Sequence, residues 1–172
     1  MRLCLSGLED LHLNDNTSHI ENADLKKNRV INVVLAEDDN DDVLIFKLAL
    51  NELEIAVNLS HVDNGDKLLA LLKELLPDVI FIDVEMPCTD GISCVIQIRK
   101  NKDFDNVPVI IISGHENQKY IDETFSEGAN YYVIKASSVK QLSESLKTVF
   151  STNLGKLMYY PPKQDFVIGD IA

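Results

Sequence analysis

Between residues 29 and 150 the chain alternates short runs of apolar, often β-branched residues with longer segments in which apolar residues recur at helical spacing. The runs have the length of single strands, and several carry almost no polar residue, which is typical of strands buried on both faces of a parallel sheet. The five runs are residues 30–36, 55–62, 79–82, 107–112 and 131–134. Because strands that alternate with helices form βαβ units, the pattern predicts an α/β fold with a doubly wound sheet and helices on both faces.

The segments that follow these runs predict the helices. After a turn at residues 64–66, five leucines lie on one helical stripe that ends before Pro77, namely Leu68, Leu71, Leu72, Leu75 and Leu76. The helix at 117–127 has only a thin apolar face, and Gly128 is expected to follow its C-cap. Residues 138–141 resemble a capping box, which predicts the start of a final helix.

The charge and cysteine content of the chain exclude several classes of protein. The net charge is -12 and no basic stripe interrupts the acidity, so nucleic acid and anionic membranes are not expected as partners. The 3 cysteines lack CxxC spacing, which indicates free thiols in a reducing compartment rather than a zinc site or disulfides. No apolar run approaches membrane-spanning length, and the first residues do not resemble a signal peptide. A cytoplasmic location is the resulting prediction.

The pattern divides the chain into three parts. Residues 1–28 show no clear period and are rich in Asn, Asp and Glu, which predicts a loose N-terminal tail. Residues 29–150 form the periodic region, and residues 151–172 are a short C-terminal extension. The extension is too apolar for a freely solvated tail and too short for a DNA-binding output domain, so no separate output domain is expected.

Polar residues stand where the predicted strands end. They are Glu37, Asp38 and Asp39 after the first strand, Asp83 after the third, Ser113 after the fourth and Lys135 after the fifth. Ligands of open parallel sheets bind at the carboxyl ends of the strands, so these side chains are expected to share one pocket. Clustered carboxylates repel one another unless a cation joins them, and oxygen ligands suit Mg²⁺. With a hydroxyl and an ammonium beside them, the set is sufficient for phosphoryl transfer.

Simpler interpretations exist for some of these acids. Asp38 and Asp39 could cap the first helix, because aspartate is favoured at N-caps. Glu37 before them and the distant Asp83 favour a metal site instead. Residues 40–42, Asn-Asp-Asp, are interpreted as a solvated first helical turn that the helix dipole favours.

In this order and at these separations, the motifs resemble the receiver domain of two-component response regulators. The matching residues are Glu37-Asp38, Asp83 within the segment DVEMP, Asp90-Gly91, Ser113-Gly114, and Lys135 after Tyr132. The resemblance extends from about Val30 to Phe150. It implies the flavodoxin-like receiver fold, a five-stranded parallel sheet in the order 2-1-3-4-5, and a signalling phosphoacceptor rather than an enzyme.

The resemblance also implies roles at the pocket. Asp83 would accept a phosphoryl group from a phosphohistidine on a histidine kinase or phosphotransfer protein. Asp38 and Asp83 would ligate Mg²⁺ directly, Glu37 directly or through water, and Glu85 through its backbone carbonyl. Lys135 would pair with Asp83 and then with the phosphoryl group.

Further roles concern the response to phosphorylation. Ser113 would report it, and Tyr132 would turn into the space that the Ser113 hydroxyl vacates. The signal would pass to an unknown downstream protein, with a homodimer as a further option. Glu85 and His115 each lie two residues beyond a site residue, so they are expected to flank the phosphoryl group and set its lifetime.

One departure and two alternatives remain. The family usually has proline after the site lysine, whereas Ala136 follows Lys135 here, which leaves the shape of that loop open. A haloacid-dehalogenase-like phosphohydrolase also uses an aspartate nucleophile, but its metal-binding acids follow its lysine, whereas Glu37 and Asp38 come first in this chain. A receiver-shaped scaffold that is never phosphorylated is the other alternative.

Overall fold

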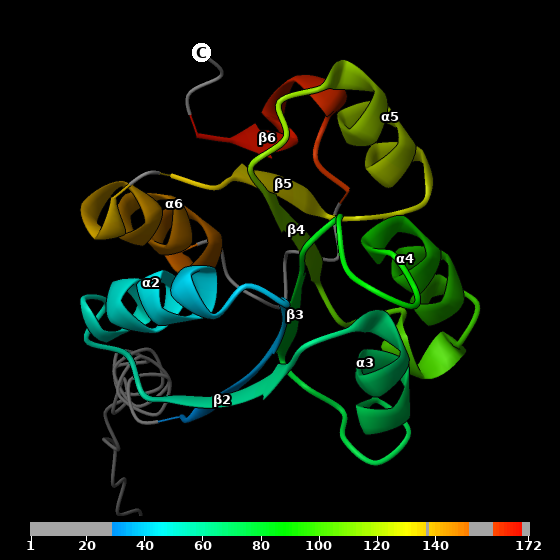
Figure 1. Cartoon of the computed structure of the whole chain (residues 1–172), viewed down its shortest axis with the longest axis horizontal. Helices are drawn as coiled ribbons and strands as arrows, with labels where there is room; N and C mark the ends of the chain where they lie inside the picture. The colour runs from blue at the N-terminus through cyan, green and yellow to red at the C-terminus, as the bar shows by residue number, and fades with distance from the viewer. Residues whose placement is uncertain (1–28, 137, 152–159, 170–172) are drawn as a thin grey trace, which may run out of the picture.

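A six-stranded parallel sheet forms the centre of the computed structural model, which describes residues 29–136, 138–151 and 160–169 (Figure 1). The strand order is β2-β1-β3-β4-β5-β6. The strands are β1 (Ile31–Ala36), β2 (Val57–Val62), β3 (Val79–Ile82), β4 (Val109–Ser113), β5 (Tyr131–Ile134) and β6 (Val167–Ile168). The predicted α/β class and the order 2-1-3-4-5 are confirmed, and a short sixth strand is added at the β5 edge.

Helices cover both faces of this sheet, as a doubly wound fold requires. They are α2 (Asn40–Asn51), α3 (Gly65–Leu71), α4 (Gly91–Arg99), α5 (Gln118–Ser126) and α6 (Val139–Ser151), with short 3₁₀ turns η1 (Lys102–Phe104) and η3 (Lys163–Asp165). Figure 1 shows α2 and α6 on one face and α3, α4 and α5 on the other. Two separate clusters of buried apolar residues fill the spaces between the sheet and these two layers.

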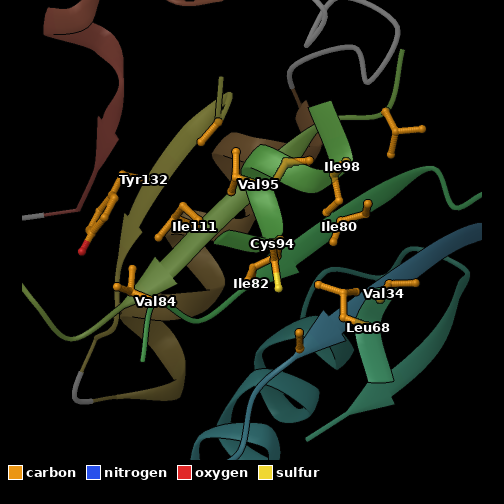
Figure 2. Packing of buried hydrophobic residues seen from close by; sticks show 14 of the residues in the cluster. Val34, Leu68, Ile80, Ile82, Val84, Cys94, Val95, Ile98, Ile111 and Tyr132 are labelled. Carbon is orange, nitrogen blue, oxygen red and sulfur yellow. The ribbon is translucent and has the colours of Figure 1, made fainter. Parts of the chain in front are cut away.

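The core on the α3–α4 face shows why the sequence folds this way. All four residues of β3 are buried, so both faces of this central strand need apolar side chains. In Figure 2, Ile80 and Ile82 from β3 pack together with Leu68 from α3 and with Cys94 and Val95 from α4. Burying each aliphatic side chain of this size contributes about 1.5–3 kcal/mol. This packing fixes the parallel strands in place, so their carboxyl ends lie together at one edge of the sheet.

Two helix ends follow their sequence signals closely. Gly128 has φ +94° directly after the C-cap of α5, and so it occupies the left-handed position expected of a glycine there. At the start of α6, the Ser138 hydroxyl oxygen accepts the Gln141 N–H at 3.3 Å, and the hydroxyl itself donates to the Gln141 side chain at 2.9 Å. The predicted helix start at Ser138 is therefore confirmed, with the Gln141 side chain bound to the Ser138 hydroxyl, whereas a full capping box would bind the Ser138 N–H.

The leucine stripe predicted after residue 66 is wrong at its C-terminal end. The helix α3 ends at Leu71 and Leu72 caps it, while Leu76 is 61% exposed. The residue before a proline is disfavoured in helical conformation, and Leu76 precedes Pro77. The helix therefore cannot continue through Leu76, and because α3 already ends at Leu71, the chain approaches β3 through turns and leaves Leu76 in solvent.

The C-terminal segment 160–169, called the C-terminal strap below, lies along the β5 edge of the sheet. Its strand β6 is parallel to β5, and the Tyr132 N–H donates to the Phe166 carbonyl at 2.9 Å. Phe166 is fully buried against this edge. The apolar character of the extension predicted such packing, but a two-residue strand is too short to show a period-2 pattern.

Some expectations fall outside the described residues. The predicted tail at 1–28 does so, as do the apolar residues Leu154, Leu157, Met158 and Tyr159 of the extension. Within the described ranges, no helix combines the length and apolar character that crossing a bilayer would demand.

Candidate functional site

The pocket predicted at the carboxyl ends of the strands is present. Glu37 and Asp38 directly follow β1, and Asp83 directly follows β3. Glu37 and Asp83 are 2% and 5% exposed, whereas Asp38 lies at the surface. One carboxylate oxygen from each of the three lies within 4.8 Å of the others. Three converging carboxylates with two of them buried form a donor set that suits a hard divalent cation.

Asp83 is the least satisfied group of this pocket. Its Oδ1 atom is buried and accepts no hydrogen bond among the described residues, and the Lys135 Nζ atom lies 3.5 Å away. Burial raises the pKa of Asp83, and the nearby charge of Asp38 adds to this effect, although Lys135 opposes it. A buried oxygen without a donor is costly, and a bound cation or phosphoryl group would satisfy it.

Lys135 enters the pocket from the end of β5 and contacts more than one carboxylate. Its Nζ atom lies 2.7 Å from Glu37 Oε2 and 2.7 Å from Asp42 Oδ2. Burial alone would lower the pKa of Lys135, but hydrogen bonds to Asp42 and Glu37 and the charge of Asp83 outweigh it and hold the pKa above its ordinary value. The predicted contact with Asp83 is thus the longest of the three.

Glu37 links the start of α2 to Lys135. Its Oε1 atom accepts the Asp39 N–H at 3.2 Å, while its Oε2 atom contacts Lys135. Burial raises the pKa of Glu37 to about 7, although Lys135 opposes the shift. Ionising this side chain therefore costs free energy even beside Lys135, and a bound metal cation would lower that cost.

Asp42 was missed by the sequence interpretation, which placed it in a solvated helical turn. Asp39 caps α2, since it accepts the N–H groups of Asp41 and Asp42, so the simpler interpretation of the acids after β1 is confirmed for Asp39. The Asp42 side chain, however, is only 37% exposed and pairs with Lys135. The signal that could have located it is spacing, because the first turn of a helix that directly follows β1 lies over the strand ends.

Ser113 and Tyr132 meet on the other side of Asp83. Ser113 is fully buried at the end of β4, and its hydroxyl oxygen accepts the His115 N–H at 3.2 Å. The Tyr132 hydroxyl donates to the His115 carbonyl at 2.7 Å. Tyr132 is itself fully buried, with Phe166 beside its ring at a centroid distance of 6.4 Å. Tyr132 therefore already lies inward beside the strap in this structure, and its movement on phosphorylation stays a prediction.

Glu85 and His115 face each other across the mouth of the pocket. Their Oε2 and Nε2 atoms lie 3.0 Å apart, and both side chains are substantially exposed, at 58% and 43%. The Tyr120 hydroxyl approaches the other Glu85 oxygen at 3.4 Å. The two side chains therefore form a pair, while their place beside a phosphoryl group, their influence on its lifetime and the role of the Glu85 carbonyl stay predictions.

Two loop features shape the rest of the pocket. A cavity of about 580 Å³ lies beside Asp38 and Glu85 and extends to Asp90 and Tyr120. Gly91 lies against the Asp83 backbone so closely that a Cβ atom there would be 2.1 Å from the Asp83 carbonyl oxygen. Only glycine fits at this position, which explains the Asp90-Gly91 motif.

Near Lys135, where Ala136 replaces the usual proline, the described backbone contains no cis peptide.

Comparisons with known proteins bear on this arrangement. A family model described as the response regulator receiver domain matches residues 33–147. The chain is 30% identical over 115 residues to the probable C4-dicarboxylate response regulator DctR of Bacillus subtilis (strain 168), which covers 67% of this chain and 50% of DctR. It is also 27% identical over 117 residues to the transcriptional regulatory protein KdpE of Staphylococcus aureus, covering 68% of this chain and 48% of KdpE. The chain therefore spans about half the length of these two relatives.

Solved structures share the same arrangement of strands and helices. The phosphorylated cyanobacterial phytochrome response regulator RcpA superposes with a TM-score of 0.66 at 23% identity, covering 70% of this chain and 91% of RcpA. The Mn²⁺-bound form of response regulator Rcp1 gives a TM-score of 0.65 at 22% identity, covering 77% of this chain and 99% of Rcp1. At such identities, the likeness establishes the fold.

Proposed function

The chain belongs to the response regulator receiver domain family, and from this premise we propose that it is a phosphorylation-switched module with Asp83 as its phosphoacceptor. The family consists of signalling phosphoacceptors rather than enzymes, so the phosphohydrolase alternative is set aside. The observation that carries the proposal is the Asp83 Oδ1 atom, which is buried, accepts no hydrogen bond from the described residues and lies 3.5 Å from the Lys135 ammonium. A nucleophilic oxygen with a cation beside it suits attack on a phosphoryl group.

The proposed donor is a phosphohistidine on a histidine kinase or a histidine phosphotransfer protein. An Asp83 carboxylate oxygen forms a bond to phosphorus while the phosphorus–nitrogen bond of the donor breaks. The electron pair of that bond and a proton return to the imidazole, and Asp83 becomes an acyl phosphate. Such donors draw their phosphoryl groups from ATP, so the cytoplasm is the location that the proposal requires.

The proposed cofactor is Mg²⁺, held by the carboxylates of Glu37, Asp38 and Asp83 and by the backbone carbonyl of Glu85. The close approach of the three carboxylates supports a cation here, as does the buried Asp83 oxygen, which accepts no hydrogen bond among the described residues. When bound, the cation would neutralise negative charge on the phosphoryl oxygens. The solved form of Rcp1 with Mn²⁺ is a precedent for a divalent cation in this fold.

Lys135 and Ser113 are proposed to bind the remaining phosphoryl oxygens. Lys135 contributes positive charge from one side of Asp83, and the buried Ser113 hydroxyl contributes a hydrogen bond from the other. The Ser113 oxygen can donate its hydrogen to the phosphoryl group while it still accepts the His115 N–H, so a pull on the hydroxyl would also draw on His115. Phosphorylation would therefore act first on the loop after β4.

We further propose that this disturbance changes a surface for a downstream protein. His115 binds the Tyr132 hydroxyl through its carbonyl, and the Tyr132 N–H binds the Phe166 carbonyl in the strap. Ser113 and the strap are thus connected by consecutive contacts, and the face made by α5, β5 and the strap is the expected output or homodimer surface. In this proposal residues 29–150 are the receiver domain and residues 151–172 an extension that contributes to its output face, with residues 1–28 as a tail.

Intact mass spectrometry after incubation with acetyl phosphate and Mg²⁺ tests the phosphoacceptor. The chain is expected to gain one phosphoryl group, and Asp83→Asn is expected to prevent the gain. Asp90→Asn is a matched control, because Asp90 is an exposed acid near the same pocket that caps α4. Undiminished labelling of Asp83→Asn would disprove the assignment, and a wild-type chain that never gains mass would favour the unphosphorylated scaffold.

A further inference from the structure

Three carboxylates surround the Lys135 ammonium, and they do not hold it equally. Glu37 and Asp42 each lie 2.7 Å from Nζ, whereas Asp83 lies 3.5 Å away and its Oδ1 atom accepts no hydrogen bond among the described residues. The ammonium is therefore displaced from the phosphoacceptor toward α2. Since its own side chain is only 18% exposed, this position is set by the protein rather than by solvent.

Asp42 differs from the other two partners of Lys135 because it is not a candidate ligand for the cation. Glu37 and Asp83 belong to the group of carboxylates that could hold a cation, and Asp42 does not. A cation that draws on Glu37 and Asp83 leaves Asp42 as the partner that still binds Lys135. The charge that keeps the ammonium in place would then come from α2.

Asp42 is well placed for such a role because its backbone is fixed. Its N–H donates to the Asp39 side chain at 3.3 Å, within the cap that starts α2. The next residue, Val43, and Phe46 one turn later are buried in the core between α2 and the sheet. A carboxylate on a rigid helix positions its partner more precisely than one on a loop.

We infer that Asp42 is a positioning residue for phosphoryl transfer, which tethers the Lys135 ammonium beside Asp83 without letting it close on the nucleophilic oxygen. The inference rests on the proposed function. An ammonium has three N–H donors, so Lys135 can keep one bond to Asp42 and direct the others to phosphoryl oxygens. Without Asp42, the ammonium moves onto the open Asp83 Oδ1 atom, where it competes with the incoming phosphorus.

The expected consequence is a slower maximal rate of phosphorylation with little change in cation binding. Asp42→Asn keeps a hydrogen-bond acceptor but removes the charge, and we expect the maximal rate to fall about threefold. Asp42→Ala removes both, and we expect a fall of about tenfold. Asp42→Glu keeps the carboxylate and is expected to recover most of the rate. The Mg²⁺ concentration for half-maximal rate should change less than about twofold in all three variants, because Asp42 is not a proposed ligand.

The test measures labelling by acetyl phosphate, in which the new Asp83 oxygen–phosphorus bond replaces the bond to acetate and acetate leaves. Rates are recorded against acetyl phosphate and against Mg²⁺ for the wild type and the Asp42 variants. Asp41→Asn is the matched control, because Asp41 lies on the same helical turn, is exposed and makes no ion pair among the described residues. It removes the same charge from the first turn of α2 and should leave the rate unchanged.

A second readout does not depend on phosphorylation. In ¹⁵N NMR spectra of the Mg²⁺-loaded chain, the Lys135 ammonium should give a slowly exchanging signal that weakens in Asp42→Asn and Asp42→Ala but persists in Asp41→Asn. Equal rates and equal Lys135 signals in Asp42→Ala and Asp41→Asn would overturn the inference while leaving Asp83 as phosphoacceptor. If the wild type itself gains no phosphoryl group, the proposed function fails first, and the NMR comparison still decides whether Asp42 holds Lys135.

Discussion

The carboxyl edge of the sheet and the β5–β6 edge are built on opposite principles. At the carboxyl edge, Glu37 and Asp83 are buried with raised pKa values, and one Asp83 oxygen accepts no hydrogen bond within the described part of the chain. At the β5–β6 edge, Phe166 is fully buried and its backbone carbonyl is hydrogen-bonded to Tyr132. The first region stores unfavourable electrostatic energy that a ligand can release. The second consists of satisfied contacts, which can transmit a displacement because they leave little free space.

The contrast predicts that stability depends strongly on the strap. Phe166→Ala should lower the free energy of unfolding by about 3–5 kcal/mol, since it empties a fully buried aromatic site between Tyr132 and Phe125. Urea unfolding followed by circular dichroism measures this. Leu76→Ala is the control, because Leu76 is a large apolar residue that is 61% exposed, and it should change stability by less than about 0.5 kcal/mol. Equal effects of the two substitutions would mean that the strap does not contribute to the core.

The same contrast predicts that the pocket responds to pH and the strap does not. The pKa of Glu37 is raised to about 7 from 4.5. The protonated side chain therefore stabilises the folded state at pH values below the pKa of the unfolded chain. This contribution to stability is lost as the pH rises through about 7. A cation needs the ionised form. Mg²⁺ affinity should therefore increase with pH up to about 7 and then level off, with a slope of at most about tenfold per pH unit from Glu37.

Calorimetric titration with Mg²⁺ at about pH 6 and about pH 8 measures this dependence. Glu37→Gln should bind Mg²⁺ more weakly and with a smaller pH slope, and the slope that remains would come from Asp83, whose pKa is also raised. Asp41→Asn should retain the wild-type slope, since Asp41 lies outside the cluster of three carboxylates. A wild-type affinity independent of pH would show that the buried acids are already ionised without the cation.

The comparison also explains how far the sequence predicts this molecule. Strand order, the two helical layers and the positions of Glu37, Asp38, Asp83, Ser113 and Lys135 follow from periodicity, strand ends and the family resemblance. These are properties of whole runs of residues or of fixed motifs. Because the pocket depends on such motifs and the strap on individual contacts, the sequence predicted the pocket more fully than the strap.

The misses have a common physical cause, because each depends on a contact between distant segments. Asp42 is an ordinary helix-start acid until Lys135, 93 residues later, is placed beside it. The enclosure of Tyr132 depends on Phe166 from the far end of the chain, and β6 has only two residues. Leu76 fits a helical stripe in sequence, and its exposure follows from where the chain must turn before β3.

Tyr132 joins the two regions, and removing its hydroxyl should weaken that connection. Tyr132→Phe loses the bond to the His115 carbonyl but keeps the ring and the backbone bond to Phe166, so stability should fall by only about 1 kcal/mol. In hydrogen exchange with and without beryllofluoride and Mg²⁺, the wild type should change protection in residues 117–150 and in the strap. Tyr132→Phe should keep the change around Asp83 and reduce it in the strap. Changes confined to the vicinity of Asp83 in the wild type would remove the proposed output face.

The smallest effect is expected at the mouth of the pocket, where Glu85 and His115 pair at 3.0 Å but remain largely exposed. Exposed ion pairs contribute about 0–1 kcal/mol, so we expect the pair to shield an acyl phosphate only weakly. In His115→Ala and Glu85→Ala, water should reach the phosphoryl group more easily, and dephosphorylation should accelerate about two- to fivefold.

The lifetime is measured by intact mass spectrometry, as the loss of the phosphoryl mass after acetyl phosphate is removed. Lys119→Ala is the control for a charged side chain on the nearby first turn of α5. Slower dephosphorylation in both variants would mean that the pair orients the attacking water, and unchanged rates would remove it from the chemistry. Because both side chains are substantially exposed and Asp83 is buried, substitution of the pair should leave the pH dependence of Mg²⁺ binding unaltered.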